Sequence, residues 1–139
     1  MDEQGVLILG PPGSGKSDLA LRLIDQPGSG TSGRLRVAQL VSDDQVLISH
    51  SGDVLLASAP REIHGKLEVR GLGIVTLPVR GTVQLVLAVR LDAVSSIERM
   101  PDREAFEVLG IALPMVRIDP TQPSAPARLR AALDWLEAC

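Results

Sequence analysis

The stretch Gly10-Pro-Pro-Gly-Ser-Gly-Lys-Ser17 decides the fold of this chain, because it fits the pattern G-x-x-x-x-G-K-[ST] at every fixed position. The run before it, Gly5–Leu9, is apolar throughout, as is typical of a strand buried on both faces of a sheet. The run after it, Lys16–Asp25, carries apolar residues at helical spacing, namely Leu19, Ala20, Leu23 and Ile24. Together they predict an α/β domain with a phosphate-binding loop (P-loop).

The residue types in the loop explain how it would bind phosphate. Glycines at positions 10, 13 and 15 let backbone N–H groups approach phosphate oxygens without a Cβ in the way. The following helix N-terminus favours an anion, Lys16 would reach the β- and γ-phosphates, and Ser17 would ligate Mg²⁺. We therefore expect nucleoside triphosphate binding by Gly10, Pro11, Pro12, Gly13, Ser14, Gly15, Lys16 and Ser17. The alternative is a Gly/Pro-rich turn that carries Lys-Ser by chance.

Length and composition narrow the class of protein. The 139 residues suit one domain, over residues 1–139, and 14 basic against 17 acidic side chains leave a net charge of −3. Without a basic block, and with Phe106 and Trp135 as its aromatics, the chain is not expected to bind nucleic acid. No apolar run approaches the ~18 residues of a membrane span. The single cysteine, Cys139, excludes an internal disulfide and favours a cytoplasmic protein.

The rest of the sequence predicts a region rich in β-strands, followed by helices. Turn residues Pro27–Gly33 predict a flexible surface loop. Apolar runs predict short strands and helical patterns follow them, so the central sheet is expected to be mixed. The expected strands are Val37–Val41, Val46–Ser49, Val54–Ala57, Ile74–Val79, Val83–Val89 and Met115–Ile118, and the expected helices are Asp102–Leu109, capped by Gly110, and Ala127–Glu137.

Two acidic residues follow the apolar residues Leu40 and Val41 and the adjoining Ser42. Asp43 and Asp44 stand where a Walker B carboxylate would be expected, at the end of a strand. Adjacent residues on a strand point opposite ways, so one carboxylate would face the nucleotide and could accept a proton from a substrate hydroxyl. A plain Asp-Asp turn between two strands is the alternative.

Further along, Leu67-Glu-Val-Arg-Gly-Leu-Gly-Ile-Val75 places Glu68 and Arg70 two residues apart, on one face of a strand. Glycines at 71 and 73 indicate a tight bend or a close approach by another chain. From the residues alone, a solvated strand edge is the favoured explanation of the charged pair. Arg99, before Met100 and Pro101, would ordinarily be a surface arginine.

The combination of these motifs resembles the C-terminal catalytic domain of the HPr kinase/phosphorylase family, bacterial enzymes that phosphorylate a serine of the phosphocarrier protein HPr. The resemblance covers about residues 5–118, and its most specific part is the stretch from Leu67 to Val75. It implies an α/β P-loop NTP-binding fold with a mixed central sheet, phosphoenolpyruvate-carboxykinase-like. It also implies ATP and Mg²⁺ as cofactors, HPr or an HPr-like protein as partner, a possible homo-oligomer, and regulation of the phosphotransferase system and of carbon/nitrogen metabolism.

The resemblance also implies roles for single residues. Ser17 and Glu68 would hold Mg²⁺, Lys16 would neutralise the transferring phosphate, Asp44 would be the general base, and Arg99 would stabilise the transition state. Residues 68–77, which include Arg70, would form a loop shared by the forward and reverse reactions. Asp43 is the second candidate for the catalytic carboxylate.

Three departures from the family pattern shape the expected activity. The family's N-terminal domain has no counterpart here, which is similar to the short form of the enzyme. The role of a family histidine upstream of the P-loop is also unfilled, either because the sequence is a fragment or because the residue is lost. The stretch Asp119–Ser124 lacks the arginines of the family's dephosphorylation loop, so kinase activity is expected over phosphorylase activity. A nucleotide-binding regulatory module without turnover and a small-molecule P-loop kinase are the alternatives, although no arginine-rich lid supports the latter.

Overall fold

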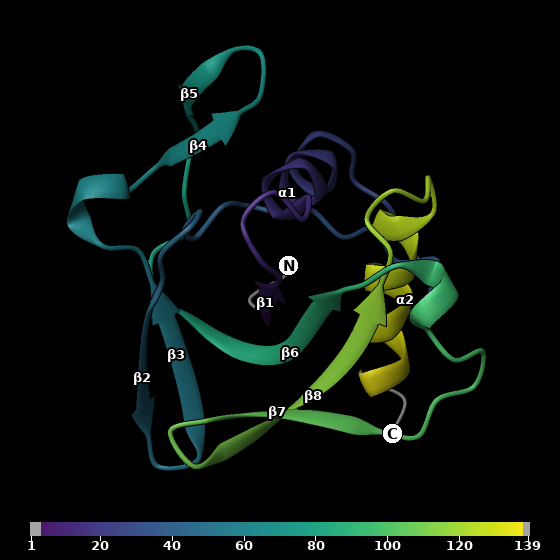
Figure 1. Cartoon of the computed structure of the whole chain (residues 1–139). Helices are drawn as coiled ribbons and strands as arrows, with labels where there is room; N and C mark the ends of the chain where they lie inside the picture. The colour runs from purple at the N-terminus through teal and green to yellow at the C-terminus, as the bar shows by residue number, and fades with distance from the viewer. Residues whose placement is uncertain (1–3, 138–139) are drawn as a thin grey trace.

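The structure is a computed structural model that describes residues 4–137, so Cys139 lies outside the described residues. Its strands are β1 (Gln4–Leu9), β2 (Leu47–Ser51), β3 (Val54–Ser58), β4 (Lys66–Val69), β5 (Gly73–Thr76), β6 (Val83–Leu91), β7 (Glu104–Val108) and β8 (Ile111–Ile118). Its helices are α1 (Lys16–Asp25) and α2 (Ala125–Glu137), with 3₁₀ turns η1 (Arg61–Ile63) and η2 (Val94–Ser96). The order of these elements is therefore not a regular βαβ alternation. Figure 1 shows a curled sheet with both helices on one side.

The main sheet is mixed, as the sequence predicts. Its order is β2-β3-β6-β8-β7, and β1 also pairs with β6. The pairs β1–β6 and β6–β8 are parallel, whereas β2–β3, β3–β6 and β7–β8 are antiparallel. Because β1, β6 and β8 run the same way, their carboxyl ends meet at one edge of the sheet, and the P-loop leaves β1 at that edge.

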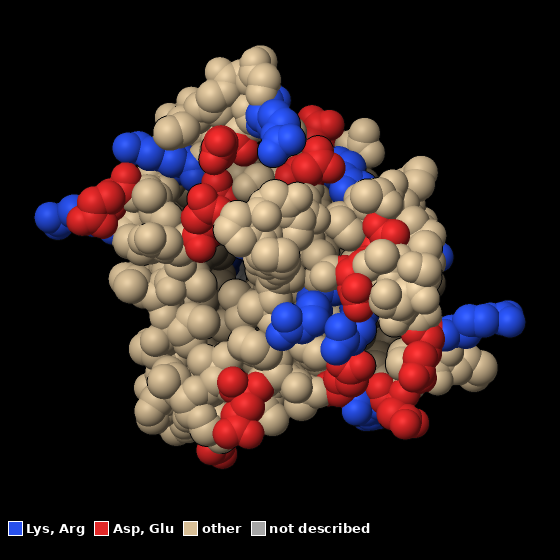
Figure 2. Space-filling view, in the orientation of Figure 1, with Lys and Arg blue, Asp and Glu red and all other residues tan. Residues whose placement is uncertain are grey.

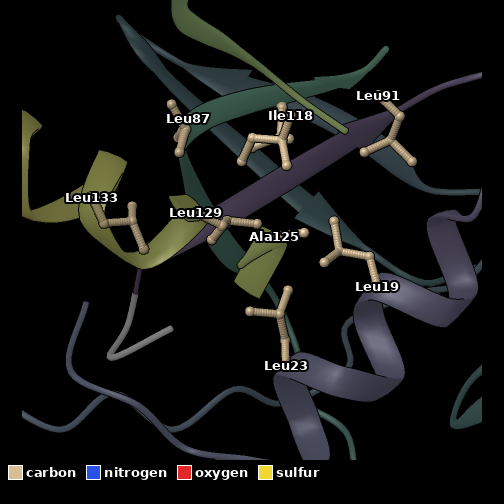
Figure 3. Close-up of a cluster of buried hydrophobic side chains, with 9 residues drawn as sticks. Leu19, Leu23, Leu87, Leu91, Ile118, Ala125, Leu129 and Leu133 are labelled. Carbon is tan, nitrogen blue, oxygen red and sulfur yellow. The ribbon is translucent and has the colours of Figure 1, made fainter. Parts of the chain in front are cut away.

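The core lies in two layers, one on each face of the curled sheet. Figure 3 shows α1 and α2 facing the sheet through Leu19, Leu23, Ala125, Leu129 and Leu133, which pack against Leu87, Leu91 and Ile118. The opposite layer comprises Leu55, Ala57, Val83, Leu85, Ala88 and Leu113. Both layers are aliphatic, as the shortage of aromatic residues requires. They hold α1, and with it the N-terminal end at Lys16, firmly against the sheet.

The predicted helix Asp102–Leu109 is wrong, because this segment contains strand β7. Its side chains alternate between half-buried and exposed positions from Glu104 to Val108, which is the period of a strand. Leu109 (φ 51°) and Gly110 (φ 76°) both have positive φ and form the tight turn into β8. Gly110 therefore turns a β-hairpin and does not cap a helix.

The predicted strand Val37–Val41 is also absent. Within it only Leu40 makes a bridge, a parallel one to Val79, and the N–H of Arg80 donates to the carbonyl of Leu40 at 2.8 Å. The remaining predicted strands and helices are present with shifted ends, the largest shift being at β8, which begins at Ile111 instead of Met115.

The loop Pro27–Gly33 is largely exposed, as the sequence predicts, and hydrogen bonds join it to α2. The carboxylate of Asp134 accepts hydrogen bonds from the N–H groups of Thr31 (2.8 Å) and Ser32 (3.1 Å). It also pairs with Arg36, whose side chain is fully buried. Although burial raises the pKa of Asp134, the hydrogen bonds from Thr31 and Arg36 outweigh it and lower that pKa to about 2.

Candidate phosphate-binding site

The P-loop has the backbone that its glycines predict. Gly13 and Gly15 have φ angles of 80° and 100°, which L side chains rarely adopt. A Cβ on Gly10 would lie 2.4 Å from Ser14 Oγ and 3.1 Å from Ser14 Cβ, so Ser14 would have to move to admit a side chain. The loop closes with the Ser14 N–H donating to the Pro11 carbonyl at 3.1 Å, and α1 begins directly at Lys16. The first-turn N–H groups of α1 therefore stand at the loop, where an anion is favoured.

Lys16 crosses the loop. Its Nζ donates a hydrogen bond of 2.7 Å to the carbonyl of Gly10, and the side chain is half-buried. The ammonium thus already lies within the ring of backbone that would surround a phosphate. A bound phosphoryl group would take this ammonium over from the carbonyl.

The two adjacent aspartates have different environments. Asp43 is half-buried: Ser17 Oγ donates to its Oδ1 at 2.7 Å, and the backbone N–H of Glu68 donates to its Oδ2 at 3.1 Å. Asp44 is exposed. One carboxylate thus joins the P-loop to β4, while the other stays accessible to a substrate.

A cavity of about 520 Å³ lies in front of these groups, and we call it the P-loop cavity. Lys16, Ser17 and Asp44 line it together with Glu68 and Arg70. Most of the residues proposed from the sequence for chemistry are thus brought together from three separate parts of the chain. Figure 2 shows acidic and basic side chains intermingled on this side of the molecule, without a large patch of one sign.

The β4–β5 hairpin brings Glu68 and Arg70 to the cavity. Its register pairs Glu68 with Ile74 and Val69 with Gly73. Arg70 lies in the turn beyond β4, so it does not share a strand face with Glu68 as the sequence pattern predicts. The tight bend predicted from the glycines is confirmed by φ angles of 90° at Gly71 and 108° at Gly73.

Arg99 is not brought to this cavity within one chain. It is exposed in the segment between η2 and β7 and does not line the P-loop cavity. Figure 1 shows that segment on the side of the molecule away from the β4–β5 hairpin. Its proposed role in the transition state stays a prediction, and in this geometry it requires either a movement of the loop or a second subunit.

Asp119 is a supporting residue that the sequence motifs do not single out. It is 8% exposed and accepts hydrogen bonds from Thr121 Oγ1 (2.6 Å), the Thr121 N–H (2.9 Å) and the Val94 N–H (2.9 Å). The hydrogen bonds from Thr121 lower the pKa of Asp119 and keep it ionised. Pro120, the next residue, packs against the P-loop: a Cβ on Gly15 would lie 3.3 Å from it.

Arg22 links the same loop to α1, since its guanidinium donates to the carbonyls of Pro120 and Gln122. The signal that could have pointed to this support is an aspartate at the carboxyl end of a strand parallel to β1. The support acts on the P-loop through Pro120 and does not touch the P-loop cavity itself.

The oxygen donors around the loop suit Mg²⁺. Ser17 and Glu68, which both line the cavity, carry a hydroxyl and a carboxylate, and Asp43 accepts a hydrogen bond from that hydroxyl. Mg²⁺ is usually held by one or two carboxylates together with substrate phosphates. Within residues 4–137, no three His, Cys, Asp or Glu side chains form a cluster that could hold a metal by itself. A hydroxyl and a carboxylate are donors that would fit a metal held together with phosphate oxygens.

Comparison with known proteins decides the family. The family described as "HPr Serine kinase C-terminal domain" matches residues 1–128. The chain belongs to this family. A relative named "HPr kinase/phosphorylase 1" from Oceanobacillus iheyensis is 33% identical over 91% of this chain and 38% of its own length. The "HPr kinase/phosphorylase" of Clostridium tetani is 35% identical over 77% of this chain and 32% of its own length.

The HPr serine kinase C-terminal fold is also shown by a solved structure. The HPr(Ser) kinase/phosphatase from Coxiella burnetii matches with a TM-score of 0.79 and 25% identity, over 99% of this chain and 91% of that chain. This match confirms the α/β P-loop fold with a mixed sheet. The chain spans less than two fifths of the length of the two curated relatives. No helix in residues 4–137 is long and apolar enough to cross a membrane.

Proposed function

We propose that this chain is an ATP-dependent protein-serine kinase that phosphorylates HPr or an HPr-like phosphocarrier, with Mg²⁺ as its metal. The observation that carries the proposal is Asp43, which hydrogen-bonds both the Ser17 hydroxyl of the P-loop and the backbone of Glu68. This contact sets the two residues proposed for the metal on either side of one cavity. Membership of the HPr serine kinase C-terminal family supports HPr as the acceptor.

The residues that line the cavity have different roles in phosphoryl transfer. The P-loop amides and Lys16 bind the triphosphate and compensate its charge, while Ser17 and Glu68 would hold the metal, which would supply further charge neutralisation. Asp44, exposed at the cavity, takes the proton of the incoming serine hydroxyl. Positioning by these groups provides most of the rate, because phosphoryl transfer needs little covalent chemistry from the protein.

Arg70, at the hairpin turn, lies where it can contact either the phosphates or the acceptor. Arg99 completes the site from outside, which is consistent with a homo-oligomer in which a loop of one subunit reaches the cavity of another. The forward reaction is favoured over the phosphorylase reaction, because Asp119–Ser124 carries no arginine beside the P-loop. The proposed setting is the cytoplasm, with regulation of the phosphotransferase system and carbon/nitrogen metabolism as the role.

The experiment is transfer of label from Mg·ATP to the cognate HPr-like protein, comparing the wild type with Asp44→Asn. Removal of the base is expected to slow transfer about 10²–10⁴-fold, while nucleotide affinity changes little. Asp53→Asn, an exposed aspartate in the β2–β3 turn, is the matched control and should keep full activity.

Three other results would contradict the proposal in distinct ways. Nucleotide binding without any transfer by the wild type identifies a regulatory module. Label that appears on a small molecule and never on protein identifies a small-molecule kinase. Equal transfer by Asp44→Asn and the wild type removes Asp44 as the base and leaves Asp43 as the candidate.

A further inference from the structure

Two arginines lie side by side at the carboxyl edge of the main sheet. The register pairs Arg90 of β6 with Arg117 of β8 on one side and with Leu9 of β1 on the other. Leu9 is the last residue before the P-loop, so Arg90 stands one strand spacing, about 4.8 Å, from the start of that loop. Figure 2 shows a small group of basic side chains, bordered by acidic ones, where Figure 1 draws the ends of β6 and β8.

Both arginine side chains lie on the face of the sheet that α1 and α2 do not cover. The guanidinium of Arg90 lies 5.9 Å from the ring centre of Phe106, which packs against the layer opposite the helices. Met115 packs against the same layer, and Arg117, two residues further along β8, points the same way. The two arginines therefore border an open face of the sheet beside the P-loop.

The two arginines differ in their partners. Arg117 donates hydrogen bonds to Glu104 at 3.1 Å and to Asp92 at 3.2 Å, so its charge is compensated. Arg90 is half-buried and makes no hydrogen bond or ion pair with any residue in the part of the chain that the structure describes. None of its nitrogens is a buried atom without a partner, so its guanidinium reaches solvent. Arg90 therefore carries an uncompensated charge at the surface.

The surroundings of Arg90 favour a ligand with a single negative charge. Attraction between the guanidinium and the ring of Phe106 holds the side chain in place and leaves its edge free. This edge presents N–H donors in a planar fork that matches the two oxygens of a carboxylate. The nearby carboxylates of Asp92 and Glu104 would repel an anion with several charges. Arg90 therefore suits one carboxylate better than a polyphosphate.

The proposed general base belongs to the same side of the sheet. Val41 and Val46, on either side of Asp44 in the sequence, pack against the same layer as Phe106. A protein that brings a serine hydroxyl to Asp44 over this face would also cover Arg90. A charged contact at that place would select acceptors by the charge beside their serine.

We propose that Arg90 is a specificity-determining residue, which binds an aspartate or glutamate side chain of the protein acceptor close to the serine that is phosphorylated. This inference rests on the proposed kinase function and names a feature of its substrate. Arg90 acts in binding of the acceptor and takes no part in the chemical step. Its loss should therefore raise the KM for the acceptor and leave kcat and the KM for ATP unchanged.

The experiment is steady-state transfer from Mg·ATP to the cognate HPr-like protein by the wild type, Arg90→Gln and Arg90→Lys. We expect Arg90→Gln to raise the acceptor KM by about tenfold, and Arg90→Lys to raise it less, because lysine keeps the charge but lacks the fork. Added salt should narrow the difference between wild type and Arg90→Gln. Arg128→Gln, an exposed arginine on α2, is the matched control and should keep the wild-type KM.

A charge exchange identifies the contact itself. Arg90→Glu should raise the acceptor KM further than Arg90→Gln, because it places two carboxylates opposite each other. Acceptor variants in which each aspartate or glutamate near the serine is replaced in turn by lysine are then paired with Arg90→Glu. One of these pairs should restore a low KM, which is the coupling expected of two residues in direct contact.

An unchanged acceptor KM in Arg90→Gln would overturn the inference and leave the kinase proposal standing. A rise in the KM for ATP instead would place Arg90 at the nucleotide, and failure of every charge exchange would exclude a carboxylate partner; either result also overturns it. If the wild type transfers no label, calorimetry of acceptor binding decides separately. Acceptor binding that Arg90→Gln weakens supports the inference without the kinase proposal, whereas equal binding, or none by the wild type, overturns it.

Discussion

Replacement of Asp134 by asparagine should cost about 2 kcal/mol of the free energy of unfolding at pH 7. The pKa of this carboxyl falls from 3.8 to about 2 on folding, and each pKa unit corresponds to about 1.36 kcal/mol. The side chain is 8% exposed and its partner Arg36 is fully buried, so solvent screens the pair little. At roughly 3–5 °C per kcal/mol for a chain of this size, Tm should fall by about 8 °C.

The pH dependence gives a sharper test than the loss itself. Because the folded-state pKa is lowered, the stabilisation by Asp134 is fully present above the unfolded pKa near 4 and is lost as the pH falls toward 2. Urea unfolding at a series of pH values from 7 to about 2.5 should therefore show the wild-type and Asp134→Asn stabilities converging below about pH 4. Asp53→Asn, at an exposed turn, is the control. A difference between wild type and Asp134→Asn that stays constant down to pH 2.5 would refute the assignment of this stabilisation to the Asp134 charge.

Three further predictions concern single positions. Gly28→Ala should lower the free energy of unfolding in urea by about 1–3 kcal/mol, because the new Cβ would lie 2.6 Å from Nη1 of Arg130. Arg130 is buried and donates to carbonyls at the end of α1. An unchanged unfolding midpoint would mean that Arg130 moves aside at no cost. Asp43→Asn should weaken Mg·ATP binding while nucleotide binding without metal changes little, and equal loss in both titrations would argue against a role at the metal. Lys16→Met should reduce triphosphate affinity far more than adenosine affinity in calorimetry, and a uniform loss would point to misfolding instead.

The parts of the fold that the sequence predicts well are those set by local pattern. The strand, P-loop and α1 follow from glycine positions and apolar spacing, and the structure confirms their order. The sequence predicts a helix over Asp102–Leu109 because these residues tolerate both periods, and pairing with β8 makes the segment a strand. Val37–Val41 has the composition of a strand, but a strand also needs a neighbour.

The sequence predicts which residues line the site better than it predicts the hydrogen bonds that join them. Lys16, Ser17, Asp44 and Glu68 line one cavity, as expected from motifs. The link through Asp43 depends on contacts between residues more than 20 positions apart, and no local rule specifies which of two adjacent aspartates turns inward. The contact of Arg36 with Asp134 spans 98 positions and is equally invisible to local rules.

The two hydrogen bonds of Asp43 couple the β4–β5 hairpin to the phosphate loop. This hairpin is a sheet of its own, outside the main ladder, and one carboxylate joins its backbone to the Ser17 hydroxyl. A metal–nucleotide bound as proposed would draw on that hydroxyl and so change the hydrogen bonds that hold the hairpin. Thermodynamic linkage is reciprocal: if bound nucleotide changes the affinity of the hairpin for a partner by some factor, the bound partner changes the nucleotide affinity by the same factor.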